Sequence, residues 1–236
     1  MVAEEKVRKS CRLAKEVTVS VRRLVVGMSG ATGAIYGIRL LEVLRGTAEI
    51  ETHLVISSAA AQTMLEETQY TIKEVEALAD VNYRFRDIGA AISSGSFKTI
   101  GMVVIPCSMK TLSGIANSFS DNLLLRGADV VLKDRRKLVL VTRETPLHLG
   151  HLRLMVQVVE MGGIIMPPMP AFYHRPKTLD DIINQTVNRV LDLFEIDLGY
   201  DLFERWQGMT HAGGVGLSLR KKTSQEPIEV TGESQK

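Results

Sequence analysis

The sequence predicts an α/β protein of three layers, in which a mostly parallel sheet carries helices on both faces. Short apolar runs of strand character alternate with longer segments of helical period, which is the pattern of βαβ units. The first apolar run also enters a helix through three glycines, Gly27, Gly30 and Gly33. With 236 residues, 45% of them hydrophobic, the chain is long enough for one sizeable core. We therefore expect a single Rossmann-like domain.

The elements follow one another in a regular order. The predicted strands are residues 23–28, 52–57, 101–107, 137–142 and a run within 162–168 that ends in prolines. Helices are expected after the first strand, over 59–67 and 72–79, in two stretches after Cys107, and over 149–161 and 179–194. Residues 80–99 are interpreted as a polar connection that holds the segment SSGSF.

Composition limits the classes of partner. The formal net charge of +2 comes from 29 basic and 27 acidic residues, so no global charge favours nucleic acid or an anionic membrane. Cys11 and Cys107 stand in different contexts and indicate neither a disulfide framework nor a metal cluster. No apolar stretch approaches the roughly 20 residues of a membrane span, and no secretory signal is evident. We expect a cytoplasmic protein.

The two ends of the chain are set apart from the expected domain. Residues 1–22 mix basic side chains with Glu4, Glu5 and Glu16, so we expect a poorly ordered extension there and no transit peptide. The single domain is expected to cover residues 23–208. Residues 209–236 are rich in glycine and polar side chains, and they are expected to form a disordered tail.

Polar residues and glycines gather at the predicted strand ends, where open parallel sheets bind their ligands. Gly27-x-x-Gly30-x-x-Gly33 differs from the dinucleotide pattern G-x-G-x-x-G. Ser29 and Thr32 could donate to a phosphate or to a flavin ring. Because the second strand ends in Ser57 without an acidic residue for a ribose, a mononucleotide fits better than NAD. A plain glycine turn remains the alternative.

Two further strand ends carry candidate side chains. Ser108, Lys110 and Thr111 follow Cys107 at the expected start of a helix, where several donors could meet an anion. An ordinary helix cap by Ser108 is the alternative. Arg143 and Glu144 end the strand at 137–142, where an arginine could bind an anion and a glutamate could move protons. A solvated surface pair is the other interpretation.

Other charged side chains are candidates for phosphate or metal sites. Arg126 and Lys133 are seven residues apart on one expected helix, so they lie on nearly the same face and could belong to a phosphate pocket built from several elements or subunits. Solvated faces are the simpler explanation. Asp180 and Asp181 lack the D-D-x-x-D pattern and suit the start of a helix. His148 and His151 have no third ligand at a matching spacing, so we predict no metal.

Five segments together resemble the UbiX-type flavin prenyltransferases. They are GMSGATGAIYGIRLL, ISSGSF, VIPCSMKTLSGIA, LLRGADVVLKDRRKLVLVTRETPL and PPMPAFYHRP, and they occur in the family's order between about Arg23 and Gly208. The resemblance implies a Rossmann-type sheet that binds FMN, and trimers packed into dodecamers with active sites at subunit interfaces. It also implies a reaction that joins a dimethylallyl group from dimethylallyl monophosphate to N5 and C6 of reduced FMN, without a metal. The product, prenylated FMN, would serve a UbiD-type decarboxylase.

The resemblance also assigns residues, position by position. The implied FMN contacts are Gly30, Ala31, Thr32, Ser57, Ser108, Met109, Lys110, Thr111 and Arg143. The implied contacts of the prenyl phosphate are Ser94, Gly95, Arg126, Lys133, Tyr173 and Arg189. Glu67 and Glu144 match acidic residues that handle protons, Trp206 matches an aromatic residue near the site, and Ser29 completes the catalytic set.

Three alternatives stay open at this point. An FMN-dependent cysteine decarboxylase shares the sheet and the flavin, but its Pro-Ala-Met-Asn and catalytic-His signatures are not evident, since PPMPAFY stands in that region. An aromatic acid decarboxylase subunit is a second alternative. A flavin carrier is a third, and it would leave Lys133, Tyr173 and Arg189 without a role.

Overall fold

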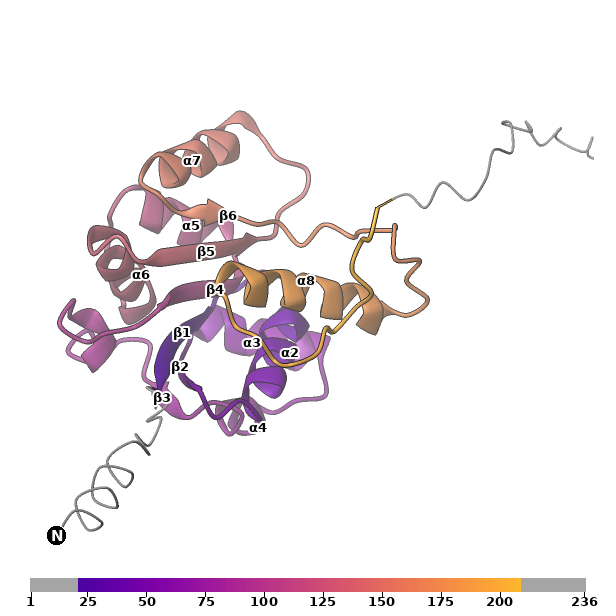
Figure 1. Ribbon diagram of the computed structural model, residues 1–236. Coiled ribbons are helices and arrows are strands. Elements are labelled where there is room, and N and C mark those ends of the chain that lie inside the picture. The colour runs from indigo at the N-terminus through magenta and orange to yellow at the C-terminus, as the bar shows by residue number, and fades with distance from the viewer. Residues whose placement is uncertain (1–20, 209–236) are drawn as a thin grey trace, which may run out of the picture. The chain divides into compact units, whose positions relative to one another are not determined.

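Six parallel strands form one sheet in the part of the chain that the computed structural model describes, residues 21–208 (Figure 1). The strands are β1 Arg22–Met28, β2 Ile50–Ile56, β3 Val81–Tyr83, β4 Gly101–Cys107, β5 Lys137–Thr142 and β6 Ile164–Ile165. Their order across the sheet is β3-β2-β1-β4-β5-β6. This order is that of doubly wound sheets, in which the direction of progress reverses between β1 and β4. The predicted Rossmann-like fold class is confirmed.

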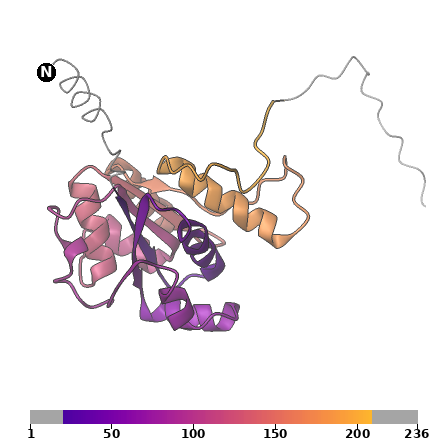
Figure 2. The ribbon, with the colours of Figure 1, turned by 60° about the horizontal axis from the view of Figure 1, so that its bottom comes forward.

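Helices cover both faces of the sheet, as Figure 2 shows. They are α2 Ala34–Leu44, α3 Ser58–Glu67, α4 Ile72–Glu76, α5 Met109–Ala116, α6 Leu123–Lys133, α7 Leu149–Glu160 and α8 Leu179–Leu193, with a 3-10 turn η1 at Ala91–Ser93. α2, α3, α4 and α8 share one core with the sheet, and α5, α6 and α7 share the other. None of the described helices is long and apolar enough to cross a membrane; the cytoplasmic location stays a prediction.

Strand alternation separates the two cores. In β1, Leu24, Val26 and Met28 belong to the core under α2 and α8, whereas Val25 faces the core under α6. The other central strands alternate in the same way, because successive side chains of a strand point to opposite faces. β4 is buried along its whole length, as a parallel strand covered on both faces must be. The sheet is therefore a rigid support for whatever lies at its edges.

Most predicted elements occur, and the larger differences lie at the sheet's outer strands; β2 covers Ile50–Ile56, where residues 52–57 were predicted. β4 and β5 have the predicted bounds, and β1 begins one residue earlier at Arg22, a residue that the sequence places in the N-terminal extension. β3 lies within the expected polar connection and was not predicted. β6 has only two residues of the predicted run. The predictions for residues 1–20 and 209–236 fall outside the described residues. Up to Arg205 the described chain is one compact unit, and residues 206–208 belong to a second.

A close approach between α2 and β4 fixes how that helix lies on the sheet. Gly37 is buried in α2, and a Cβ there would lie 2.5 Å from the carbonyl oxygen of Ile105 and 2.9 Å from the Met28 side chain. Backbone on the sheet side cannot give way easily, since β4 is paired on both sides. The glycine therefore lets α2 contact the strand backbone.

We predict that Gly37→Ala lowers the free energy of unfolding by about 1–3 kcal/mol, as overpacking in a core does. Urea unfolding followed by circular dichroism measures the change. Gly46→Ala is the matched control, because a Cβ at this position would meet no atom within 4 Å, and it should stay within about 0.5 kcal/mol of the parent. Equal stability of the two variants would contradict the close contact.

Candidate active site

A cleft of about 1280 Å³ opens at the carboxyl ends of the central strands. Gly30 after β1, Ser57 after β2 and Ser108 after β4 all line it. The cleft thus spans the point between β1 and β4 where the strand order reverses, which is where open α/β sheets bind ligands. The expectation that strand-end residues converge is met by the three central strands.

Two helices begin at the cleft with their backbone amides directed toward it. Ser57 caps α3, and its hydroxyl accepts a hydrogen bond from the Ala60 amide at 3.0 Å. Ser108 caps α5 in the same way, accepting from the Thr111 amide at 3.3 Å and donating to the Thr111 hydroxyl at 3.2 Å. Helix starts carry partial positive charge and unpaired amides, so both ends favour an anionic group such as a phosphate.

Ser29 joins the ends of β1 and β4 beneath the cleft. It is buried, its hydroxyl donates to the Pro106 carbonyl at 3.0 Å, and it accepts from the Ser108 amide at 2.8 Å. Its own amide also donates to Pro106 at 3.1 Å. The side chain is thereby committed to holding Ser108. A direct catalytic role for Ser29 stays a prediction, whereas its positioning of the α5 start is visible.

The turn after β1 passes very close to the start of α3. A Cβ on Gly30 would overlap the Ala59 Cβ and lie 3.1 Å from the Ala59 carbonyl carbon. The Gly33 backbone has a φ of +99°, a conformation that glycine adopts without strain. Glycine therefore fits these two positions for different reasons. Gly30 allows the close approach at the cleft, and Gly33 allows the chain to turn into α2.

The predicted flavin contacts divide into two groups. Gly30, Ser57, Ser108, Lys110 and Thr111 line the cleft. Ala31, Thr32, Met109 and Arg143 do not belong to its lining, although they are next in sequence to residues that do or lie at the same edge. Arg143 follows β5, and its amide donates to the Cys107 carbonyl at 3.1 Å, so it stands beside the end of β4. All nine assignments as flavin contacts remain predictions.

The two predicted proton-handling glutamates lie in different settings. The Glu67 carboxylate accepts from the Gly33 amide at 2.8 Å and the Ala34 amide at 3.2 Å, so it supplies the cap that α2 otherwise lacks. Glu144 is exposed at the end of β5, where it accepts only from the neighbouring Thr145 amide, at 3.1 Å, among the described contacts. Of the two, Glu144 has the freer carboxylate for chemistry.

Four of the predicted phosphate contacts form a second cluster. The Arg126 guanidinium donates to the Ser93 carbonyl at 3.2 Å, next to Ser94. A Cβ on Gly95 would lie 2.7 Å from the Lys133 Nζ. The SSGS loop thus lies against α6, where Arg126 and Lys133 are carried, and we call Ser94, Gly95, Arg126 and Lys133 the loop–α6 cluster.

Lys133 and Gly95 lie at the opposite edge of the sheet from the cleft. Lys133 ends α6 four residues before β5 starts, and Gly95 precedes the start of β4 by six residues. Both residues therefore lie near the amino ends of β4 and β5, whereas the cleft lies at the carboxyl ends of the strands. One chain consequently carries the cleft and the Lys133 end of the loop–α6 cluster on different edges.

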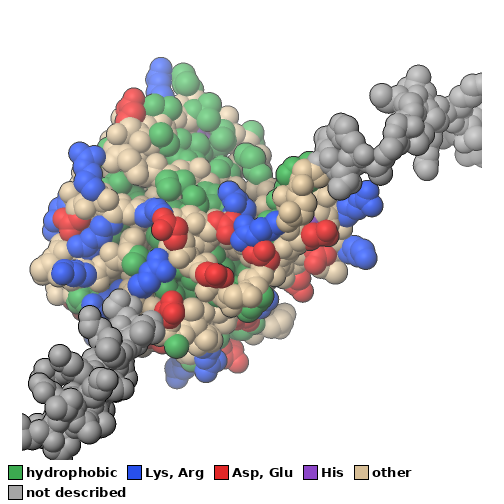
Figure 3. All heavy atoms as spheres, in the orientation of Figure 1, with side chains coloured by type: hydrophobic (Ala, Val, Ile, Leu, Met, Phe, Trp, Pro, Cys, Tyr) green, Lys and Arg blue, Asp and Glu red, His purple; other side chains and the backbone are tan. Residues whose placement is uncertain are grey.

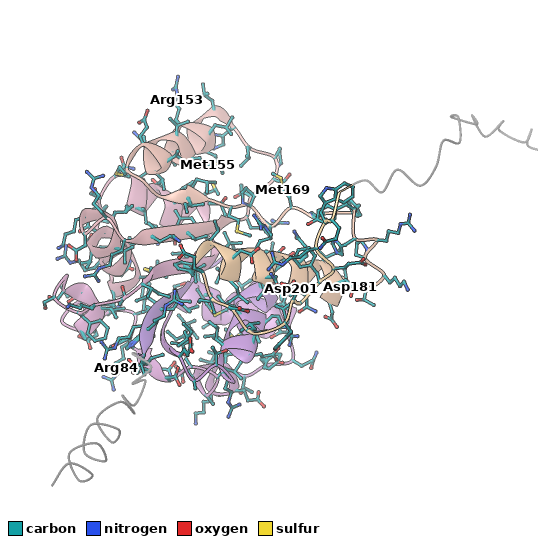
Figure 4. All side chains as sticks on the ribbon, viewed as in Figure 1. Arg84, Arg153, Met155, Met169, Asp181 and Asp201 are labelled. Carbon is teal, nitrogen blue, oxygen red and sulfur yellow. The ribbon has the colours of Figure 1, made fainter. Side chains whose placement is uncertain are left out.

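Tyr173 and Arg189 belong neither to the cleft lining nor to the loop–α6 cluster. Arg189 is on α8, on the other face of the sheet from α6, and it lines a cavity of about 320 Å³ with Met166, Pro167 and Met169. Figure 4 labels Met169 on the chain that follows β6. The Tyr173 ring lies 5.5 Å from the His174 ring and 6.4 Å from the Phe203 ring. The described contacts thus group four of the six predicted phosphate contacts in the loop–α6 cluster and leave Tyr173 and Arg189 outside it.

Of the remaining candidates, Asp181 and His148 have local explanations and Trp206 lies outside the main unit. Trp206 belongs to the separate segment 206–208, and its predicted role is untested. Asp181 accepts from the Thr178 amide at 2.9 Å within a capping box at the start of α8, as the helix-start interpretation expects. His148 caps α7 through Nδ1, which accepts from the Gly150 amide at 3.0 Å. The described residues contain no group of three or more His, Cys, Asp or Glu side chains suited to a metal.

Several cleft residues were missed by the sequence analysis. Phe85, Arg86 and Ile88 come from the connection after β3, and Phe119 and Asp121 from the turn before α6. The Leu123 amide donates to the Phe85 carbonyl at 2.9 Å and joins these two segments. Phe119 and Ile88 are exposed apolar side chains within polar stretches, and that contrast is the signal that could have indicated them.

Cys107 does not offer a nucleophile to the cleft. It is a fully buried free cysteine at the end of β4, and burial raises the pKa of its thiol far above the ordinary value. The thiol is therefore neutral at physiological pH. The usable groups at this edge are hydroxyls, backbone amides, the Lys110 ammonium and the Arg143 and Glu144 side chains, which suit binding of a phosphorylated ligand and proton transfer.

Comparison with known proteins identifies the family. The flavoprotein family model matches residues 13–190. The flavin prenyltransferase UbiX of Escherichia coli K12 is 68% identical over 188 residues, which cover 80% of this chain and 100% of that protein. The chain belongs to the UbiX family of flavin prenyltransferases. The predicted family, the transferase class and the flavin are thereby confirmed.

Two solved UbiX structures share the fold at high similarity. A dodecameric FMN-dependent UbiX-like decarboxylase from Escherichia coli O157:H7 is 53% identical with a TM-score of 0.76, covering 79% of this chain and 100% of that one. AnUbiX in complex with FMN and dimethylallyl pyrophosphate is 52% identical with a TM-score of 0.77, covering 80% and 99%. The cysteine decarboxylase SpaF, at 18% identity and a TM-score of 0.52, shares the fold alone.

The cleft suits the flavin of this UbiX family. It is wide enough for a mononucleotide, two helix starts and the Ser57 and Ser108 hydroxyls face it, and Gly30 keeps its floor free of a side chain. Phe85, Ile88 and Phe119 add apolar surface for a planar ring. The helix starts and hydroxyls suit the FMN phosphate, and the apolar side chains suit its aromatic ring.

We predict that Gly30→Ala weakens FMN binding by about tenfold or more, equivalent to about 1.4 kcal/mol, because the added methyl group pushes the β1–α2 turn away from Ala59. Flavin fluorescence titration measures the affinity, and urea unfolding of the same variant reports its stability. Gly46→Ala again serves as the control. Unaltered FMN affinity in a folded Gly30→Ala protein would show that this turn does not shape the flavin site.

Proposed function

We propose that this protein joins the dimethylallyl group of dimethylallyl monophosphate to N5 and C6 of reduced FMN, and that the prenylated FMN serves a UbiD-type decarboxylase. The observation that supports this most strongly is the cleft at the β1–β4 reversal, with its helix starts and apolar walls, in a chain that is 68% identical to a flavin prenyltransferase. FMN is a substrate in this reaction, since it leaves with a new ring.

The chain's first task is to hold the flavin. Thr111, Lys110 and the α5 start are suited to the FMN phosphate or its polar edge, with Ser29 fixing Ser108 in place. Ser57 and Gly30 shape the opposite wall. Reduced FMN supplies a nucleophilic N5 when it is bound. The hydroxyls and backbone amides of the cleft would orient it there.

The second task is to stabilise the phosphate that leaves the prenyl group. Arg126, Lys133 and Arg189 carry cationic side chains, and Tyr173 and Ser94 add hydroxyl donors. Such groups favour a phosphate that gains negative charge as its bond to the allylic carbon breaks, and they do so without a metal. Each cation has a carboxylate partner within its own chain: Asp129 for Arg126, Asp134 for Lys133 and Asp192 for Arg189.

The third task is proton transfer. Glu144 follows β5 near the end of β4 and its carboxylate is exposed, which supports a role in accepting the proton that C6 loses as the new ring closes. In an assembled site, a neighbouring subunit would exclude water from this position.

We further propose that the chain forms a homo-oligomer whose active sites lie between subunits. The cleft and Lys133 lie at opposite edges of one chain's sheet, which supports a site in which Lys133 comes from another copy. A dodecamer is the assembly expected, as in the relative from Escherichia coli O157:H7.

α7 offers a surface for a second copy of the chain. Leu149, Leu152, Val156 and Val159 follow each other at helical spacing, and each is between 45% and 59% exposed, whereas Val158 alone of the helix is buried. Figure 3 shows hydrophobic side chains gathered in the upper part of that view, where Figure 1 places α7, and Figure 4 shows Arg153 pointing outward there. α7 packs on α5, which lines the cleft, so a copy seated on this stripe would approach the flavin site.

The reaction itself gives the first test. Purified protein is incubated without oxygen with reduced FMN and dimethylallyl monophosphate, and in parallel with the diphosphate, and the flavin is followed by mass spectrometry. We predict a gain of one prenyl unit with the monophosphate. Flavin of unchanged mass with both donors would overturn the proposal and favour a flavin carrier.

Glu144→Gln tests the proton-transfer role within the same assay. The amide keeps the shape of the side chain but cannot accept a proton, so turnover should fall by about 10²–10⁴-fold while FMN affinity stays within about twofold. Stopped-flow absorbance and the fluorescence titration measure the two quantities. An equal loss of FMN binding would mean that Glu144 holds the flavin and does not move protons.

Mixed oligomers test whether two chains build one site. Lys133→Ala and Glu144→Gln chains, each almost inactive alone, are co-expressed with different tags, and the mixed assembly is purified and checked by light scattering. With random mixing in a symmetric oligomer, about a quarter of the sites receive an intact cleft and an intact Lys133, so activity should return to that level. If Lys133 served the cleft of its own chain, no site would be intact and activity would not return.

A further inference from the structure

A continuous chain of ionic contacts runs from Lys133 back into the SSGS loop. The Lys133 ammonium donates to the Asp134 Oδ1 at 2.8 Å, and the Asp134 Oδ2 accepts from the Arg136 Nη2 at 2.9 Å. Arg136 then donates to the Gly95 carbonyl at 2.5 Å through Nη2 and to the Phe97 carbonyl at 2.8 Å through Nη1. One arginine and one aspartate thus connect the end of α6 with the loop opposite.

The turn that ends α6 makes this connection possible. Arg135 has a φ of +57°, in the left-handed region, and its amide and that of Arg136 donate to Leu132 and Val131 as the helix closes. The reversal allows Asp134 and Arg136, on either side of Arg135, to hydrogen-bond to each other and to reach residues 95–97 together. The connection is therefore a consequence of the backbone as well as of the side chains.

Gly95 is fitted closely to the ion pair. A Cβ at this position would lie 2.5 Å from the Asp134 Oδ2 and 2.7 Å from the Lys133 Nζ. Gly95 does not belong to the glycines with positive φ in the described chain, so its backbone conformation does not call for glycine. The absence of a side chain is explained by space: the loop backbone is pressed directly against the Lys133–Asp134 pair.

Exposure decreases along the chain of contacts. The Lys133 side chain is 47% exposed, Asp134 is 23% and Arg136 is 18%. The hydrogen bond from Lys133 lowers the pKa of Asp134, so its carboxylate stays ionised at neutral pH. Lys133, a flexible surface lysine, is thus linked through Asp134 to Arg136, whose planar guanidinium is held by backbone carbonyls. A lysine in place of Arg136 could not form the same set of hydrogen bonds.

We propose that Asp134 and Arg136 are positioning residues of the donor-phosphate site, an inference that rests on the proposed prenyl transfer. Arg136 holds the Ser94–Phe97 loop against the end of α6, and Asp134 holds the Lys133 ammonium over Gly95. Loop and lysine then reach the phosphate as one prearranged unit, which avoids the entropy loss of ordering a free lysine upon binding. With one carboxylate between two cations, the unit keeps a net positive charge for the phosphate.

A carboxylate close to the donor phosphate would also repel it. This repulsion gives the alternative hypothesis for Asp134. If Asp134 merely neutralised Lys133, its removal would tighten donor binding. If Asp134 positions Lys133, its removal weakens donor binding and leaves flavin binding untouched. The anchoring of Arg136 by two loop carbonyls favours positioning, because neutralisation alone would require no contact with the loop.

The test compares Asp134→Asn, Asp134→Glu and Arg136→Lys with the parent protein. For Asp134→Asn and Arg136→Lys we predict a KM for dimethylallyl monophosphate raised about tenfold, with kcat changed less than about twofold and an unchanged FMN dissociation constant. Asp134→Glu should recover most of the loss, since it restores the charge. Glu195→Gln, which breaks the Lys137–Glu195 ion pair outside any proposed site, is the control and should leave all three constants unchanged.

Calorimetric titration of dimethylallyl monophosphate into the FMN-loaded protein provides a readout that does not depend on turnover. The proposal is supported if the dissociation constant rises in Asp134→Asn in parallel with KM. It is overturned if donor affinity in Asp134→Asn is unchanged or tighter, or if FMN affinity falls as much as donor affinity. A parent protein that binds the donor but transfers no prenyl group would contradict the proposed function instead, and the two failures are thereby distinguished.

Discussion

The rest of the structure depends on one constraint: the chain leaves β1 and β4 toward opposite faces of the sheet. From the end of β1 the chain enters α2 on one face, and from the end of β4 it enters α5 on the other. The gap that this leaves must be held at a fixed width, and the buried Ser29 hydroxyl does so by joining Pro106 and Ser108 across it. This bridge, together with the bond from the Ser29 amide to Pro106, fixes the α5 start beside the floor of the cleft at Gly30.

A second constraint arises from the direction of the strands. In a parallel sheet every strand presents its carboxyl end at the same edge, so a helix that directly follows a strand starts there, and a helix that directly precedes a strand ends at the other edge. The helix starts at the cleft and Lys133 at the end of α6 therefore lie at opposite edges of one chain's sheet. The fold thus separates two halves of a reaction, and association of subunits is the proposed means of reuniting them.

Sequence reasoning succeeded where the physical signal is local. β4 and β5 are continuous apolar runs, and their bounds follow from burial on both faces. Ser57, Ser108 and Thr111 could be placed at helix starts because each follows such a run. β3 could not be predicted, because Val81, Asn82 and Tyr83 are too few and too mixed, and the strand exists only through its pairing with β2. Phe85 and Phe119 were missed for the same reason: a tertiary contact brings them to the cleft.

The short outer strands have a consequence for how copies of the chain can associate. β3 has three residues and β6 has two, and β6 is followed at once by Met166, Pro167 and Pro168, of which the prolines have no amide to donate. Neither margin of the sheet presents a long row of unpaired backbone groups, so a foreign strand finds little to pair with. Growth of the sheet from one molecule into the next is disfavoured, and contact between molecules is left to helices and loops, whose side chains specify partner and orientation.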